Sequence, residues 1–278
     1  MPIRLYHCKI VVRSTVKLLT EIKDILSKDK KRERLFRNTV FGPWLDIRFF
    51  DNDCPLMHFV LQHQVKVSNI SSDSPPLQFK IGDDLLEFGR KEFCLITGFR
   101  FGKVCKNENK ANAFRDRVFP EKKTDGIKSV YGSDCLKLVK DPNRFLALSD
   151  EDAIRLCLLI VAMLVFMGIE ERNCIPNHIL SLVEDFDAWN VFPWGEYMWH
   201  KFYQRTVNVV ERHRPVHLEK LEKNPYYNAT YNLYGFAWAF KVCHTFYSVL
   251  KFNTIVIYMY PVYKMFVSVF YPLLGFLY

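Results

Sequence analysis

The sequence lacks the short motifs that mark the common catalytic and metal-binding families. No two cysteines have the spacing C-x-x-C, so a structural zinc site would need ligands from unrelated segments. There is no G-x-S-x-G elbow, no Walker loop, no G-x-G-x-x-G after a strand and no H-E-x-x-H. We therefore predict no catalytic residue, no metal ion and no cofactor, and a non-enzymatic role.

The N-terminus lacks the apolar run of a signal peptide and carries basic residues instead. Together with eight scattered cysteines, this favours reduced thiols in the cytosol or nucleus over a secreted disulfide framework. The 39 Lys and Arg residues exceed the 30 Asp and Glu residues and give a net charge of +9. Such an excess favours anionic partners, namely nucleic acid, an acidic protein surface or membrane headgroups.

The last 37 residues have almost no charge. Residues 242–278 contain no Asp, Glu or Arg, and Lys251 and Lys264 are the only charged side chains. All 30 acids lie in the preceding 241 residues, a density that would place four or five acids in this stretch. The composition therefore predicts that the globular domain ends near residue 241.

Three interpretations of this apolar tail stay open. A transmembrane helix over residues 254–278 has sufficient length, but Lys264, Pro261 and Pro272 oppose it. A buried hydrophobic hairpin is the second. The third is a translated intron, because Val242-Cys243 can be encoded by a common splice-donor sequence and T-rich codons give residues of this kind.

The periodicity of apolar residues changes from helical to strand-like and back along the chain. Leu77, Phe79 and Ile81 alternate with polar residues before a turn at Gly82, which predicts a β-hairpin. Ser149 and the acids behind it begin a nearly all-apolar segment that we expect to be the central buried helix. Further predictions are helices at residues 14–29, 53–67, 176–189 and 193–212, a short helix ending at Gly98, and an extended Lys-rich loop at residues 103–130. The fold class is α+β, mainly helical, with one small β-hairpin or sheet and a hydrophobic C-terminal tail.

The clearest basic segment, residues 28–34, is expected to extend the polar side of the first helix. Two acids interrupt it, so a solvated helix face and a phosphate-binding patch both fit the pattern. The candidates for binding nucleic acid are Lys30, Lys31, Arg32, Arg34 and Arg37.

Histidines and acids at close spacing give only weak signals for a site. His58 and His63 are five residues apart, and Pro215 between His213 and His217 is expected to prevent a regular helix there. Surface or packed histidines are the favoured interpretation.

A cluster of three acids, Glu184, Asp185 and Asp187, has the chemistry to bind a divalent cation. Acids so close on a helix point in different directions, however. A solvated or Arg-paired turn is therefore favoured over a metal site.

Several longer strings together resemble one known domain. They are residues 41–45, 88–102, 117–120, 148–153, 187–195 and 231–236. They resemble a plant-specific domain of unknown function that commonly precedes a ubiquitin-like-protein (SUMO) protease domain in Mutator-type, transposon-derived proteins. The likeness covers about residues 35–241, and the strings 88–102 and 187–195 are specific to it.

The resemblance implies a domain without an established active site, so it assigns no catalytic residue. The expected organisation is an N-terminal helix and basic segment (1–34), the plant domain (35–241) and the apolar tail (242–278). We predict a transposon-derived interaction module, nuclear or cytoplasmic, with nucleic acid or a neighbouring protease domain as partner. The alternatives are a membrane-anchored protein and a fragment of a SUMO-protease-like cysteine peptidase that lacks its catalytic domain.

Overall fold

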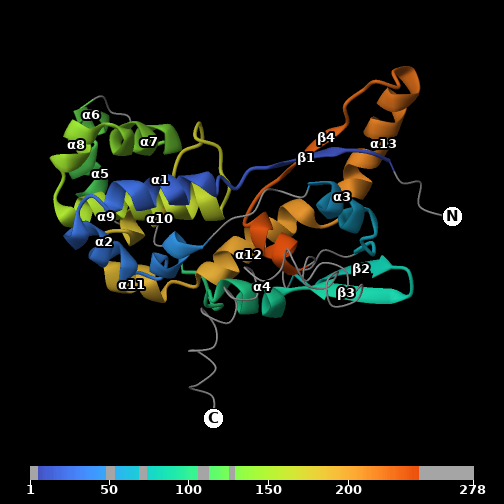
Figure 1. Ribbon diagram of the computed structural model, residues 1–278, viewed down its shortest axis with the longest axis horizontal. Coiled ribbons are helices and arrows are strands. Elements are labelled where there is room, and N and C mark those ends of the chain that lie inside the picture. Colours follow the sequence, from blue (N-terminus) through green and yellow to red (C-terminus); the bar gives the residue numbers. More distant parts are fainter. Residues whose placement is uncertain (1–5, 48–53, 69–73, 106–112, 125–128, 244–278) are drawn as a thin grey trace, which may run out of the picture.

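Helices form most of the chain, as the sequence predicted. The structure is a computed structural model that describes residues 6–47, 54–68, 74–105, 113–124 and 129–243. One end of the molecule (Figure 1) holds α1 (Lys17–Leu26), α2 (Lys30–Arg37), α5 (Ala113–Val118), α6 (Pro120–Thr124), α7 (Gly132–Lys140), α8 (Pro142–Leu146), α9 (Asp150–Ile160), α10 (Asn177–Leu182) and α11 (Phe186–Val191). The remainder holds α3 (Cys54–Gln62), α4 (Arg90–Thr97), α12 (Trp194–Thr206), α13 (Val209–Lys223) and the strands β1 (Lys9–Val12), β2 (Leu77–Ile81), β3 (Asp84–Phe88) and β4 (Thr230–Leu233).

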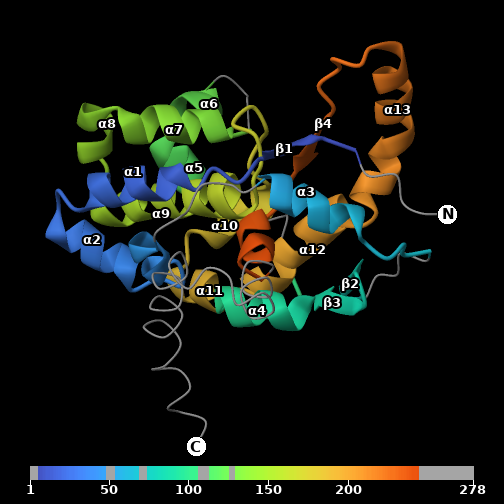
Figure 2. The same cartoon turned by 45° about the vertical axis from the view of Figure 1, so that its right-hand side comes forward.

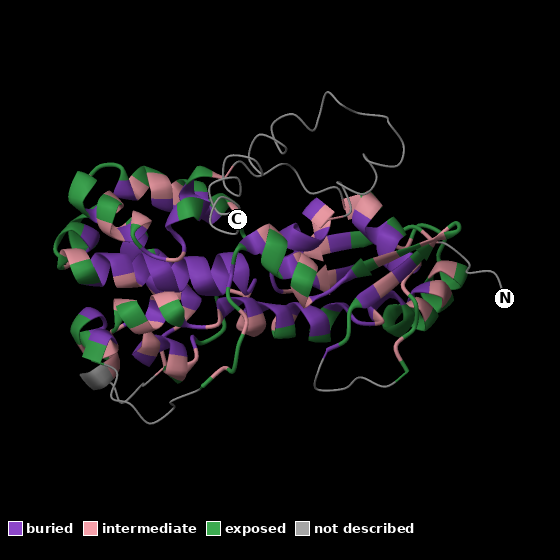
Figure 3. Cartoon of the chain, turned by 90° about the horizontal axis from the view of Figure 1, so that it is seen from below, coloured by how far each residue is buried: buried purple, intermediate pink, exposed green. Residues whose placement is uncertain are grey.

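The helical end is built around α9, which confirms the predicted central helix. The Ser149 hydroxyl caps it by accepting a hydrogen bond from the backbone nitrogen of Asp152 at 3.1 Å. The helix continues into a π-helical segment, η2 (Val161–Phe166), and is buried almost throughout, as Figure 3 shows. It ends where Gly168 adopts a positive φ of 57°.

Two separate two-stranded sheets lie at the other end, although the sequence predicted only one. The predicted hairpin is confirmed, with β2 and β3 antiparallel and Leu77 opposite Phe88. The second sheet pairs β1 with β4 in parallel, with Lys9 opposite Thr230. Beyond this sheet α13 projects from the body, and the chain returns along it into β4 (Figures 1 and 2).

Aromatic rings join the two ends in one core. The Phe166 ring of η2 lies 4.9 Å from Phe41, 5.2 Å from Trp44 and 4.8 Å from Phe236, measured between ring centroids. All four are buried. Phe41 precedes η1, a 3-10 turn (Gly42–Asp46), and Trp44 lies within it, so this short segment is anchored by large apolar contacts.

The prediction of an extended loop at residues 103–130 was wrong, because α5 and α6 lie within it. Helices of five or six residues are too short to show a clear apolar period and are not stable alone. The buried rings of Phe114 and Phe119 and the side chain of Val118 anchor this segment in the core.

The helix predicted at residues 53–67 ends early, at Gln62, and three other predicted helices contain a break that the sequence analysis missed. The first predicted helix ends at Leu26, and the basic segment begins a new helix, α2. The Asp29 side chain caps α2 by accepting hydrogen bonds from the backbone nitrogens of Lys31 at 2.8 Å and Arg32 at 3.2 Å. Asp185 divides residues 176–189 into α10 and α11 in the same way. Asn208, with a φ of 52°, separates α12 from α13.

The expectation that Pro215 prevents a regular helix was also wrong, since it lies inside α13. Proline costs about 3 kcal/mol in a helix interior. The helix packs through its first residues, Val209 and Val210, and through the buried side chain of His217, and these contacts offset part of that cost.

Candidate anion-binding surface

Arg32, one of the five residues expected to contact phosphate, is buried beneath α2. Its side chain is 6% exposed and pairs with Asp150 at 2.9 Å. It also donates to the backbone carbonyls of Phe145 at 3.1 Å and Leu148 at 2.7 Å. The guanidinium therefore joins α2 to the segment between α8 and α9 and faces away from solvent.

Of the other four candidates, two pair with acids and two have no acidic partner in the described part of the chain. Arg37 donates to Asp46 at 2.6 and 3.2 Å, and Lys31 contacts the carboxylate of Asp150 at 2.6 Å. Lys30 and Arg34 are exposed and form no ion pair with any described residue. Only these two cations of α2 are thus fully available to a ligand.

A second group of cations, which sequence analysis missed, gathers where α12 meets α13. The Lys201 Nζ lies 5.9 Å and the Arg205 Cζ 5.0 Å from the ring centroid of Tyr234. Arg212 donates from Nη2 to the backbone oxygen of Arg205 at 2.7 Å, which brings it to the same place. We call Lys201, Arg205 and Arg212 the α12–α13 cationic cluster. None of the three pairs with an acid within the described ranges.

The pKa values of Lys201 and Arg212 are those of partly buried cations without an acidic partner in the part of the chain that the structure describes. Burial lowers the pKa of Lys201, and the charge of Arg205 lowers it further. The same two causes lower the pKa of Arg212. The hydrogen bonds that Arg37 donates to Asp46 and Glu33 instead raise the pKa of this residue on α2. Because like charges disfavour one another, an anion that entered the cluster would be stabilised there.

The carboxylate beyond Tyr234 is already neutralised. The Tyr234 hydroxyl donates to Glu170 at 3.4 Å. Glu170 also pairs with Arg172 at 2.7 Å and contacts Arg13 at 3.7 Å. Two arginines therefore offset this acid, and it leaves the cluster cationic.

A cavity of about 760 Å³ opens beside the cluster. It is lined by α12 on one side and by the loop after α4 and the end of η2 on the other. Its walls include Val104, Met167, Tyr197, His200, Lys201 and Gln204. Lys201 belongs to both the cavity and the cationic cluster, so the two are continuous.

One signal in the sequence could have located part of this cluster. Residues 197–210 contain no Asp or Glu, and Lys201 and Arg205 lie four positions apart on one helix face. Arg212 and Tyr234 join them only through the turn at Asn208 and the return of the chain along α13. That part of the site is a product of tertiary structure.

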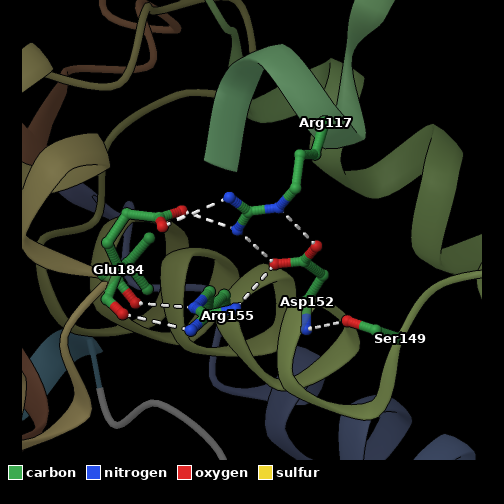
Figure 4. Close-up of polar contacts among 6 residues, drawn as sticks. Arg117, Ser149, Asp152, Arg155 and Glu184 are labelled. Carbon is green, nitrogen blue, oxygen red and sulfur yellow. Dashed lines mark hydrogen bonds and ion pairs between the residues drawn. The ribbon is translucent and has the colours of Figure 1, made fainter. Parts of the chain in front are cut away.

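Of the three acids considered for metal binding, Glu184 belongs to an arginine-paired network (Figure 4), and Asp185 caps α11. Arg117 Nη2 contacts Glu184 at 2.8 Å and Asp152 at 2.9 Å. Arg155 contacts Asp152 at 2.8 Å and the backbone oxygen of Glu184 at 3.1 Å. These bonds tie α5 and α9 to the turn before α11, as the Arg-paired interpretation predicts. Within the described ranges, no three His, Cys, Asp or Glu residues are placed to hold a metal ion.

Histidines that are distant in sequence meet beside β1 and β4 in an interior network. His58 Nδ1 lies 3.0 Å from the Tyr231 hydroxyl, and His217 Nδ1 lies 3.1 Å from the Tyr6 hydroxyl and 3.9 Å from Cys8 Sγ. Burial lowers the pKa of both histidines and raises the pKa of the Cys8 thiol to about 12. A thiol with so high a pKa is a poor nucleophile, so this network packs the interior, as expected for packed histidines.

No helix in the described ranges combines the length and apolar character needed to cross a membrane. The proposed transmembrane segment, residues 254–278, falls outside those ranges. So does Asp53, the first residue of the helix predicted at residues 53–67.

The strings that carry the family resemblance supply core residues. Phe41 packs against Phe99 at 5.7 Å, Trp189 at 5.7 Å and Trp194 at 5.2 Å, and these rings come from three different strings. Residues 61–205, about half of the chain, match the model of a family described as domain of unknown function (DUF1985). No curated protein and no solved structure matches the chain.

Proposed function

Because the chain belongs to the DUF1985 family, whose name assigns no activity, we propose from its own geometry that it is a non-enzymatic interaction module that binds nucleic acid by its phosphates. The observation that carries the proposal is the α12–α13 cationic cluster. Lys201, Arg205 and Arg212 converge with no acidic partner among the described residues, and two of them have a lowered pKa.

Phosphate is the anion that best fits this arrangement. Arginine presents several donors in a planar fork that matches phosphate oxygens, and lysine adds a point charge beside them. Three such groups that lie close together in space can contact successive phosphates of a backbone. The net charge of +9 adds a favourable long-range attraction for a polyanion.

The test is the salt dependence of binding to a fluorescent 20-base-pair DNA duplex, measured by anisotropy with the full chain. Each phosphate contact contributes about 0.9 to the slope of log affinity against log salt. The triple variant Lys201→Gln, Arg205→Gln, Arg212→Gln should therefore lower the slope by about 3 and weaken binding at low salt.

The matched control is Lys28→Gln, Lys30→Gln, Arg34→Gln, which removes the same charge from exposed residues at α2. If binding depends on the α12–α13 cationic cluster, this control should leave the slope close to that of the wild type. A loss of DNA affinity in the control alone would show that the interface is the basic segment first identified in the sequence. Equal losses in both variants, or no salt-dependent binding by the wild type, would refute the proposal.

A narrower proposal on origin and partner rests on the sequence resemblance alone. We propose that the domain derives from a plant Mutator-type element and stands before a SUMO-protease module in its intact form. A messenger RNA that joins the codon of Lys241 to an exon encoding such a module would support this. A messenger that continues unspliced through the apolar tail would contradict it.

A further inference from the structure

The cavity beside the cationic cluster has the size and chemistry to hold one nucleobase. Its volume of about 760 Å³ lies within the range of small-molecule sites, roughly 300–1,000 Å³. Met167, Val104 and the ring of Tyr197 supply apolar and aromatic surface for the flat face of a base. Stacking on such surface is tolerant of base identity, because every base has a π-face.

Polar groups at the same cavity can contact the edge of a base. Gln204 Nε2 and His200 Nε2 lie 2.7 Å apart, so the amide is held in place and its carbonyl oxygen remains an acceptor. Glu196, which also lines the cavity, is occupied by Arg90, with contacts of 2.8 and 3.0 Å. The acid in the wall is therefore neutralised and does not repel a nucleotide.

The position of the cavity relative to the cluster fits the repeat of a nucleic acid. Tyr197, Lys201 and Gln204 lie at helical spacing along one side of α12, and Arg205 follows directly. A phosphate on the α12–α13 cationic cluster would thus carry its base toward the cavity. Bases in a duplex are paired and stacked, so only an unpaired base can enter.

We propose that this cavity receives an unpaired base and that the protein binds single-stranded nucleic acid in preference to duplex. The inference rests on the proposed phosphate binding and specifies its ligand. The cavity supplies the selectivity for the single strand, and the cationic cluster supplies the affinity that both forms share.

The test compares a fluorescent 12-nucleotide oligothymidine with a 12-base-pair duplex at one salt concentration, using the full chain. The single strand should bind about tenfold more tightly. Gln204→Trp, which fills the cavity from an exposed position on α12, should remove this preference and change duplex binding less than twofold. The control Thr20→Trp, on the exposed side of α1, should keep the preference.

A second measurement does not depend on a variant. A single strand that carries 5-iododeoxyuridine should cross-link under ultraviolet light to α12, with Tyr197 as the expected acceptor. Cross-links confined to other segments would overturn the inference, as would equal affinity for the two nucleic acids or an intact preference in Gln204→Trp. In each of those cases salt-dependent binding of both forms would still support phosphate binding, whereas its absence would remove both proposals.

Discussion

The substitution Arg32→Met tests whether Arg32 stabilises the fold or contacts nucleic acid, the role first considered for it. The side chain is 6% exposed, pairs with Asp150 at 2.9 Å and donates to the carbonyls of Phe145 and Leu148. Methionine retains much of the apolar stem and removes the charge and every donor. We expect the protein to lose stability and to retain its affinity for nucleic acid.

The magnitude follows from what remains after the substitution. Breaking a fully buried ion pair costs about 3–5 kcal/mol. Asp150 is 21% exposed and keeps its contact with Lys31 at 2.6 Å, so its charge stays partly compensated. The carbonyls lose charged donors, each hydrogen bond of this kind being worth about 1.5–3 kcal/mol. The two hydrogen bonds alone give about 3 kcal/mol at the low end of that range, so we expect the free energy of unfolding to fall by at least about 3 kcal/mol.

Urea denaturation measured by circular dichroism is the assay. With a denaturant slope of about 3 kcal/mol per molar, the midpoint should fall by at least about 1 M urea. Lys30→Met, an exposed change on the same helix, should alter stability by less than about 0.5 kcal/mol. Coincident midpoints for the two variants would refute the structural role of Arg32, and a specific loss of nucleic-acid affinity in Arg32→Met would return it to the interface.

Three further predictions concern backbone strain and pH. Gly235→Ala should destabilise by more than about 2 kcal/mol and Gly82→Ala by about 1 kcal/mol in thermal melts, because both have positive φ but only the former would place its new Cβ 2.8 Å from the Phe202 backbone. Burial tends to raise the pKa of Asp152, but the hydrogen bonds donated by its arginine partners outweigh burial and lower this pKa from 3.8. The stability that the Asp152 carboxylate contributes is therefore lost as the pH falls through the lowered pKa. Asp152→Asn should show a smaller loss of stability below about pH 4 in urea titrations. Burial lowers the pKa of His217 from 6.5 in the folded protein, so the unfolded chain binds the proton first as the pH falls. The free energy of unfolding should therefore decrease below about pH 6.5. His217→Gln should flatten this dependence in the same titrations, and an unchanged pH profile in the variant would contradict the prediction.

Local signals were sufficient for much of the secondary structure. The alternation around Gly82 predicted the hairpin, and the cap at Ser149 predicted the start of the central helix. Both depend on residues close together in the chain. The breaks at Asp29 and Asp185 were missed because an aspartate inside a helical pattern is compatible with either an exposed face or a new cap.

The candidate site was much less accessible to sequence reasoning. Charge density directed attention to the basic segment of α2, where the structure buries Arg32 and pairs Arg37 with acids. A list of charges does not show which cations meet an acid in space. Lys201 and Arg205 lacked nearby acids in the sequence as well, but two cations on one helix are an ordinary solvated pattern.

The sequence by itself determined the mainly helical class, the hairpin, the buried central helix and the strings that match the DUF1985 family, since each arises from residues that are neighbours along the chain. Tertiary structure alone decided the pairing of β1 with β4, more than two hundred positions apart, and with it the return of Tyr234 to α12. Contacts across such distances depend on loop closure and on the packing of the whole core, which no local pattern encodes. The α12–α13 cationic cluster exists because that closure brings α12, the first turn of α13 and the end of β4 together.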